Sequence, residues 1–114
     1  MIEKQEKIFK ALSDKNRIRI VKMLQRKPLC VCEIREVLNL AVSTVSKHLS
    51  ILRDAGIITD RKDGKWINYK INPSPDAAAA SALLYIQLLL EDDETIKKDR
   101  KKITKVDRNI LCCK

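Results

Sequence analysis

One segment of the chain, LAVSTVSKHLSILRDAGII at residues 40–58, has the pattern of an amphipathic helix with two very different faces. Val42, Val45, Leu49 and Leu52 recur at the spacing of one helical face, so this stripe is expected to pack against a core. The opposite face offers hydroxyl groups and a cation but almost no carboxylates, which suits a negatively charged, hydrogen-bonding groove. The segment therefore predicts a recognition helix. Its candidate DNA contacts are Ser43, Thr44, Ser46, Lys47 and His48.

The residues before this helix predict three shorter helices. The first covers residues 3–12, the second follows Asp14 as its amino-terminal cap, and the third begins near residues 31–33. In the second helix an inward stripe alternates with three cations that we expect to lie in solvent. The stripe is Ile18, Val21 and Leu24, and the cations are Arg17, Arg19 and Lys22. Asn39 stands where a tight left-handed turn would join the third helix to the recognition helix, and Gly56 where such a residue would end the latter. The arrangement predicts a helix-turn-helix.

From residue 57 to residue 71 the hydrophobic period changes from helical to alternating. Asp63 and Gly64 form a strong signal for a two-residue hairpin turn between two strands. A basic hairpin directly after a recognition helix is typical of a wing that contacts the DNA backbone or a minor groove. The alternative is a solvated hairpin whose lysines keep the protein soluble. The candidate contacts at its tip are Arg61, Lys62 and Lys65.

The segment DAAAASALLYIQLLLEDD at residues 76–93 predicts a helix that is apolar around most of its circumference. Ser74 followed by Pro75 is a good helix start. So much apolar surface in a small protein favours a dimer interface, and the alternative is a buried central helix of a monomer. We therefore predict a winged helix-turn-helix domain with dimerisation helices over residues 1–94. A basic segment over residues 95–114 would form either a helix that docks on the partner subunit or a mobile tail.

The length, composition and net charge of the chain restrict the class of protein. A chain of 114 residues fits a single domain, and a sequence with 2 glycines and 3 prolines predicts a mainly α fold with a small β-hairpin and about five to six helices. The formal net charge of +9 favours a polyanionic partner. No apolar run is long enough to span a membrane, and the amino terminus lacks the apolar core of a signal peptide, so we expect no membrane contact and a cytoplasmic location.

The four cysteines form two pairs, Cys30 with Cys32 and Cys112 with Cys113. In a reducing cytosol such thiols are candidates for metal ligands rather than for a disulfide framework. The first pair straddles the expected junction between a loop and the third helix, where the helix dipole should lower thiol pKa values. All-sulfur ligation selects soft or borderline ions such as As(III), Sb(III), Cd(II) and Pb(II). Two thiolates are too few for a tight site, so we expect a third from Cys112 or Cys113, unless that pair is incidental.

With these motifs in place, the sequence resembles the ArsR/SmtB family of bacterial metal-responsive repressors. The matching segments are ALSDKNRIRIVKML, LCVCEI, STVSKHLSILRDAGII and DGKWINYKI, which together cover roughly residues 11–71. The resemblance implies a winged-helix homodimer, paired through its first and fifth helices, that blocks an operator until metal binding releases it. It also implies that Cys30 and Cys32 are ligands. The chain departs from the arsenic sensors at Arg35, where those have a third cysteine, and from the cadmium and lead sensors because no cysteine precedes Cys30.

We therefore expect a repressor that binds double-stranded operator DNA without any cofactor and is released by As(III) or Sb(III). The first alternative is a Cd(II) or Pb(II) sensor that uses all four cysteines. The second is a repressor of the same fold that responds to thiol oxidation or persulfide. A thiol enzyme is disfavoured, because the sequence has no Cys-x-x-Cys motif, no acid or base partner near the cysteines and no phosphate-binding loop.

Overall fold

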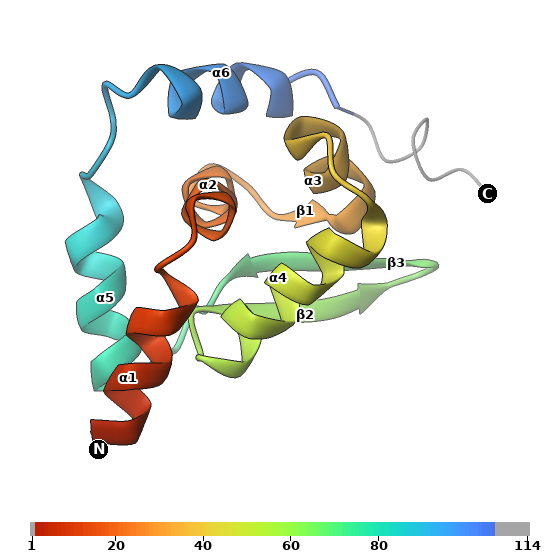
Figure 1. Cartoon of the computed structure of the whole chain (residues 1–114). Helices are drawn as coiled ribbons and strands as arrows, with labels where there is room; N and C mark the ends of the chain where they lie inside the picture. Colours follow the sequence, from red (N-terminus) through yellow and green to blue (C-terminus); the bar gives the residue numbers. More distant parts are fainter. Residues whose placement is uncertain (1, 107–114) are drawn as a thin grey trace.

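A computed structural model describes residues 2–106, which form six helices and a three-stranded antiparallel sheet (Figure 1). This architecture confirms the mainly α class with a small hairpin. The elements in chain order are α1 (Ile2–Ala11), α2 (Lys15–Leu24), β1 (Leu29–Cys30), α3 (Val31–Leu38), α4 (Val42–Asp54), β2 (Ile58–Asp63), β3 (Trp66–Ile71), α5 (Ala77–Gln87) and α6 (Glu94–Ile103).

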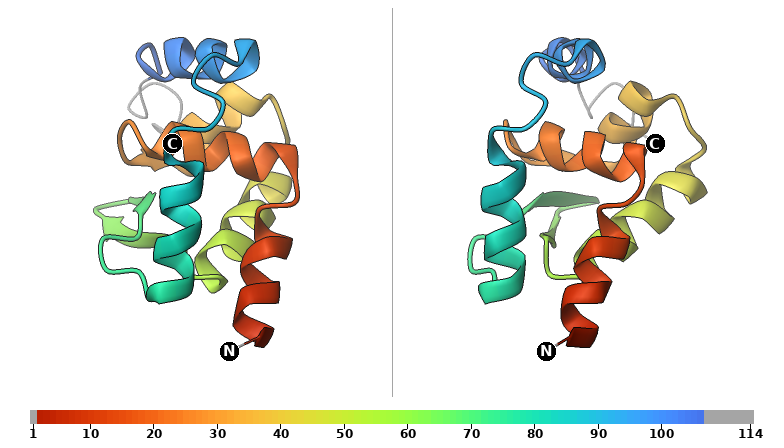
Figure 2. Two further views of the ribbon diagram at one scale, coloured as in Figure 1. Left: turned by 90° about the vertical axis from the view of Figure 1, so that its left-hand side faces the viewer. Right: turned by 60° about the vertical axis from the view of Figure 1, so that its left-hand side comes forward.

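Helix α2 occupies the middle of the molecule, between α6 on one side and the sheet on the other (Figures 1 and 2). All five residues from Ile20 to Leu24 are buried. The expectation that Lys22 lies in solvent is therefore wrong, because its side chain is completely buried. Its ammonium group donates to the carbonyl oxygens of Ile86 and Gln87, at 3.1 and 3.2 Å, and to the Glu91 carboxylate at 2.6 Å. A buried charge persists only when it is paired in this way.

The local signals that end and connect the helices are confirmed. The Asp14 carboxylate caps α2 by accepting the N–H groups of Asn16 and Arg17 at 2.8 and 3.1 Å. Asn39 adopts the left-handed conformation, with φ 57° and ψ 48°, and turns the chain from α3 into α4. Gly56, with φ 79°, ends α4 in a Schellman motif in which the N–H of Ile57 donates to a carbonyl one turn back.

The sheet contains one strand more than the sequence predicts. Strands β2 and β3 form the expected hairpin, but Asp63 pairs with Trp66, so the two loop residues are Gly64 and Lys65 rather than Asp63 and Gly64. Strand β1 pairs with the other edge of β3, where Cys30 lies opposite Asn68. A strand of two residues carries too little alternation to be recognised in a sequence.

Helix α5 is shorter than expected. Asp76 rather than Ser74 caps it, by accepting the N–H of Ala79 at 3.0 Å, and the helix ends at Gln87 instead of continuing to residue 93. The chain then turns through Leu90, whose φ is 63°. None of the helices formed by residues 2–106 combines the length and the apolar character needed to cross a lipid bilayer.

Helix α6 packs on its own chain, against α2 and α3 (Figure 1). Ile96 and Ile103 are buried in this contact. The Arg19 guanidinium donates to both carboxylate oxygens of the buried Asp99, at 2.8 and 2.9 Å, so Arg19 is not a solvent-facing residue as expected. The segment that follows α5 thus begins as a docked helix of the same chain. The division of the chain into residues 1–94 and 95–114 stays a prediction.

Candidate nucleic-acid interface and thiol site

Helix α4 is seated in the core by one face. Val45, Leu49 and Leu52 are completely buried, as expected from their spacing. Val42 was expected on the same face, but 46% of it is exposed, because it is the first residue of the helix and extends past the body of the domain. Helix α4 packs mainly against α3 and β2, with a smaller contact to α2. Its position therefore depends on these elements.

The opposite face of α4 carries the candidate DNA contacts. Ser43, Thr44 and Lys47 are exposed, whereas Ser46 and His48 are half-buried on its flanks. Lys47 has no ion-pair partner among residues 2–106. A cation without an internal partner, beside hydroxyl groups on a short exposed helix face, can bind phosphate and base edges.

Arg17 is a part of this region that the sequence analysis missed. Its Nη1 lies 3.0 Å from His48 Nδ1, and its other guanidinium nitrogens donate to the carbonyl oxygens of Ala11 and Lys10, at 2.7 and 3.2 Å. Because arginine only donates, His48 Nδ1 is the acceptor, and the Nε2–H remains available as a donor. One side chain thus links the end of α1, the start of α2 and α4. No short-range pattern signals such a link.

The hairpin presents its cations at the tip. Arg61, Lys62 and Lys65 are all exposed, and the first two have no ion-pair partner in the described part of the chain. Lys65 lies over the Trp66 ring, with its ammonium nitrogen 5.0 Å from the ring centroid. At the base of the hairpin, by contrast, Asp60 holds Arg53 of α4 at 2.9 Å. The hairpin is therefore anchored to α4 at one end and carries unpaired cations at the other.

Cys30 and Cys32 lie at the junction between β1 and α3. Cys30 is the last residue of β1 and the amino-terminal cap of α3, and only 1% of it is exposed, whereas Cys32 is half-buried in the first turn. The Glu33 carboxylate accepts the N–H of Cys30 at 2.9 Å in a capping box. The spacing of this box, with glutamate three residues after the cap, is visible in the sequence and was missed.

The chemistry of Cys30 differs from the expectation in one respect. Burial raises the pKa of the Cys30 thiol; the backbone N–H groups of Glu33 and Cys32 oppose this rise, and the Glu33 carboxylate adds to it. Desolvation thus outweighs the helix amino terminus, and the expected lowering of the pKa is wrong for this residue. A thiol held protonated in this way must release its proton when it binds an ion.

The described residues supply only part of a metal site. No group of three or more His, Cys, Asp or Glu side chains within residues 2–106 is placed to hold a metal ion. Cys32 is disulfide-bonded in this structure, whereas Cys30 is a thiol, so the expectation of two thiols does not hold here. Both sulfur atoms can bind a soft ion only after that disulfide is reduced, and two donors do not complete the coordination of the ion. Cys112 and Cys113, the candidates for further ligands, lie outside the described residues. Arg35, at the position of the third cysteine in the arsenic sensors, offers no donor to a cation.

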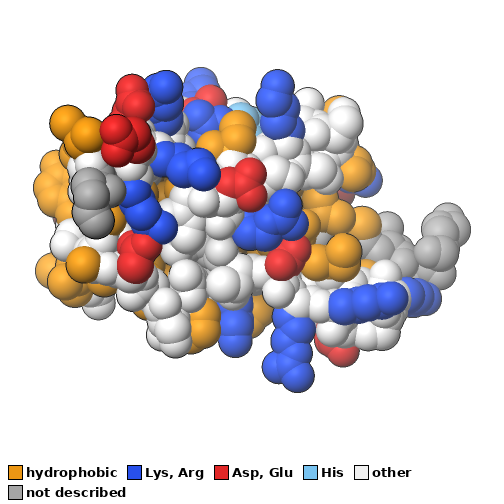
Figure 3. All heavy atoms as spheres, turned by 90° about the horizontal axis from the view of Figure 1, so that it is seen from below, with side chains coloured by type: hydrophobic (Ala, Val, Ile, Leu, Met, Phe, Trp, Pro, Cys, Tyr) orange, Lys and Arg blue, Asp and Glu red, His pale blue; other side chains and the backbone are white. Residues whose placement is uncertain are grey.

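Large apolar side chains are exposed on α1, α5 and the segment that follows α5. These residues are between 65% and 81% exposed, and hydrophobic side chains gather at the end of the molecule where α1 and α5 lie (left in Figure 3). Such a surface exceeds the scattered apolar exposure of a typical monomer. The residues are Ile2, Phe9, Leu84, Tyr85 and Leu88.

A winged helix-turn-helix with an exposed polar recognition face and a basic wing defines a DNA-binding protein, and comparisons with known proteins agree. Residues 14–60 match the model of the family described as bacterial regulatory protein, arsR family. The chain is 34% identical over 104 residues to the arsenical resistance operon repressor of Escherichia coli K12, across 90% of this chain and 81% of that protein. The chain therefore belongs to the ArsR family of DNA-binding transcriptional regulators, which is not a class of enzymes.

Two further similarities bear on the function and the fold. The chain is 44% identical over 64 residues to the cadmium resistance transcriptional regulatory protein CadC of Listeria innocua, across 55% of this chain and 54% of that protein. The homodimeric winged helix-turn-helix domain of Mb0332 from Mycobacterium bovis superposes with a TM-score of 0.67 at 21% identity, across 80% of this chain and 82% of that one. The similarity to the Mb0332 domain shows that the two chains share the same fold.

Proposed function

We propose that the protein is a homodimeric repressor that binds operator DNA and is released when As(III) or Sb(III) binds to Cys30 and Cys32. The observation that carries the proposal is the position of the two cysteines at the start of α3, the helix that packs directly against the recognition helix α4. Arsenical resistance regulation is the named role of the Escherichia coli relative. No cofactor is needed for DNA binding in this scheme, and a cytoplasmic location goes with it.

The DNA contacts in this proposal are Ser43, Thr44, Ser46, Lys47 and His48 of α4, together with Arg61, Lys62 and Lys65 of the hairpin. The assignment is supported by the exposure of Ser43, Thr44, Lys47 and the three hairpin cations, which Ser46 and His48 flank as half-buried residues. In a dimer, two such helices would enter successive major grooves about 34 Å apart. The exposed apolar residues of α1 and α5 supply a surface through which two copies can pair, which is the pairing that the family resemblance implies.

Release would follow from the packing of α3. An ion held by Cys30 and Cys32 draws the first turn of α3 toward the end of β1, and α4 must follow because it packs against α3. A small shift changes the spacing of the two recognition helices in the dimer. By linkage, the ion weakens DNA binding by the same factor by which DNA weakens ion binding, typically about 1 to 3 kcal/mol.

The third thiolate in this proposal comes from Cys112 or Cys113. Val106, the last described residue, packs against the core, and α6 before it contacts α3. Cys112 lies six positions after Val106 in the sequence, and a fully extended chain of this length reaches about 20 Å. This reach allows the ligand to come from the same protomer as well as from the partner subunit.

Similarity to the cadmium resistance regulator favours a second candidate, a sensor of Cd(II) or Pb(II) that uses all four cysteines. The two candidates differ in the number of thiolates. The As(III) sensor needs three cysteines and tolerates the loss of either Cys112 or Cys113, whereas the Cd(II) sensor needs both.

Fluorescence anisotropy of labelled DNA from the region upstream of the protein's gene tests the proposal. Under reducing conditions, As(III) or Sb(III) should release the DNA at about one ion per protomer. The variants Cys30→Ser and Cys32→Ser should bind the DNA as tightly as the unchanged protein does, and should not be released. Loss of DNA binding by these variants without any ion would contradict the assignment. Release by oxidant but by no ion would identify a thiol redox switch instead.

A further inference from the structure

His48 of helix α4 is hydrogen-bonded through one of its two ring nitrogens. Its Nδ1 accepts from Arg17 Nη1 at 3.0 Å. Its Nε2 has no hydrogen-bond partner within residues 2–106, and Nε2 is not among the buried polar atoms that lack a partner in this part of the chain. Because arginine only donates, the neutral ring carries its proton on Nε2. His48 therefore presents one N–H donor to solvent on a flank of the recognition helix.

Arg17 is held in place independently of His48. Its Nε and Nη2 donate to the carbonyl oxygens of Ala11 and Lys10, at 2.7 and 3.2 Å. These carbonyl groups belong to the last turn of α1, where a helix has no donors of its own for them. Three acceptors on two other segments thus fix one planar guanidinium group. The His48 ring is oriented by a donor that is itself anchored to the end of α1.

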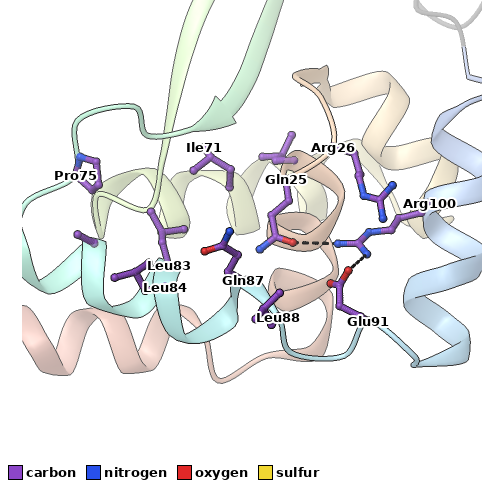
Figure 4. Close-up of a pocket in the computed structure, with 12 residues that line it drawn as sticks. Gln25, Arg26, Ile71, Pro75, Leu83, Leu84, Gln87, Leu88, Glu91 and Arg100 are labelled. Carbon is purple, nitrogen blue, oxygen red and sulfur yellow. Dashed lines mark hydrogen bonds and ion pairs between the residues drawn. The ribbon is translucent and has the colours of Figure 1, made fainter.

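The charge of Arg17 is not balanced by an ion pair. Arg100 of α6, for example, donates to the Glu91 carboxylate at 2.8 Å, which is one of the dashed lines in Figure 4. Arg17 has no ion-pair partner within residues 2–106. The Asp14 carboxylate interacts electrostatically with Arg17 and His48, but it accepts backbone N–H groups at the start of α2. The His48 donor therefore lies beside an unpaired cation, which favours an anionic acceptor.

We propose that Arg17 is a positioning residue that holds His48 so that its Nε2–H donates to a phosphate of the operator backbone. This inference rests on the proposed DNA-binding function and adds a role for Arg17 to it. A phosphate contact fixes the register of a recognition helix on the duplex, and a half-buried flank suits the backbone beside the groove better than the base edges at its floor. Neither residue belongs to the exposed apolar surface of α1 and α5, so pairing of two copies leaves the donor accessible.

Single methylphosphonate substitutions in the operator test this contact, because each replaces one charged phosphate oxygen by a methyl group. In anisotropy titrations of the full chain, substitution at one position in each half-site should weaken binding about tenfold, as expected for a hydrogen bond to a charged group. The same substitution should have no further effect on His48→Ala. If every methylphosphonate effect persists in full in His48→Ala, the inference is overturned.

Arg17→Lys separates positioning from charge, because lysine keeps the charge but cannot bind three acceptors with a planar fork. In this variant the methylphosphonate effect at the His48 phosphate should fall below about twofold. Arg19→Lys, the same change at another arginine of α2 that does not contact α4, is the matched control and should leave the tenfold effect unchanged.

Two results would overturn the role of Arg17. One is a full tenfold effect in Arg17→Lys, with or without a lower affinity for the unmodified operator, since a merely structural residue would weaken binding to all DNAs alike. The other is an equal loss of the effect in Arg19→Lys. Failure of the unchanged protein to bind the unmodified operator would contradict the proposed function itself, and with it this inference.

Discussion

Helices α2 and α4 both carry cations, but they use them in different ways. In α2, Arg17 binds carbonyl oxygens and His48, and Arg19 binds Asp99. Lys22 is fully buried and donates to three acceptors. In α4, Arg53 near the end of the helix pairs with Asp60, but Lys47 on the recognition face is exposed and has no ion-pair partner within residues 2–106. The difference teaches that a net charge of +9 does not show which cations meet a partner molecule. Only the cations without an internal acceptor are available to bind a partner molecule.

The largest expected effect is a difference in protein stability between removing a cation of α2 and removing a cation of α4. Lys22→Ala should lower the free energy of unfolding by about 3 kcal/mol, because it removes the buried donor shared by the carbonyl oxygens of Ile86 and Gln87 and by Glu91, and creates a cavity. Lys47→Ala should change it by less than about 0.5 kcal/mol. Thermal and urea unfolding followed by circular dichroism measure both. Similar losses in the two variants would remove the distinction between the helices.

The second effect concerns the ion pair between α2 and α6. Asp99→Ala should cost about 2 kcal/mol, because Asp99 is buried and its loss leaves Arg19 unpaired in a site that is only 20% exposed. Asp92→Ala, at an exposed position shortly before α6, is the matched control and should be nearly neutral. Urea midpoints compare the two. A neutral Asp99→Ala would show that apolar packing alone holds α6.

The third effect concerns DNA affinity without any change in stability. Arg61→Gln/Lys62→Gln should weaken operator binding and reduce the slope of log K against log salt by about 2, since each unpaired cation neutralises about one phosphate. Anisotropy titrations at several salt concentrations measure the slope. Lys98→Gln on α6 serves as the control with no expected change. An unchanged slope in the double variant would favour the solvated hairpin over the wing.

The smallest effect is a dependence of stability on pH. Hydrogen bonds from Arg100 and Lys22 lower the pKa of Glu91 from its ordinary value of 4.5 to about 2. Because the folded pKa lies below the unfolded one, the stabilisation is fully present above pH 4.5 and is lost as the pH falls from 4.5 toward 2. Glu91→Gln should remove this part of the acid dependence. Identical acid unfolding of both proteins would show that the pairs add nothing.

The sequence predicts well the features that short-range chemistry determines. Asp14, Asn39 and Gly56 were identified correctly because capping and left-handed turns depend on one or two residues. The inward stripe of α4 was correct except at Val42, where the helix begins.

Features that depend on distant segments could not be predicted. The burial of Lys22 requires the carbonyl oxygens at the end of α5, which lies more than sixty positions away in the chain. Strand β1 forms because β3 offers it an edge, and the raised pKa of Cys30 reflects its burial in the fold. The candidate DNA contacts could be identified as types of residue, but the link from Arg17 to His48 required the folded structure.

Cys30 belongs to two elements at once, since it ends β1, which pairs with β3, and caps α3, which packs on α4. Its backbone is therefore the junction between the hairpin sheet and the helix-turn-helix. A displacement of Cys30 moves both β1 and α3, so the positions of the hairpin and of the recognition helix are coupled. Insertions at the hairpin tip leave this junction intact, whereas a residue inserted between β1 and α3 would uncouple the hairpin from the helix-turn-helix.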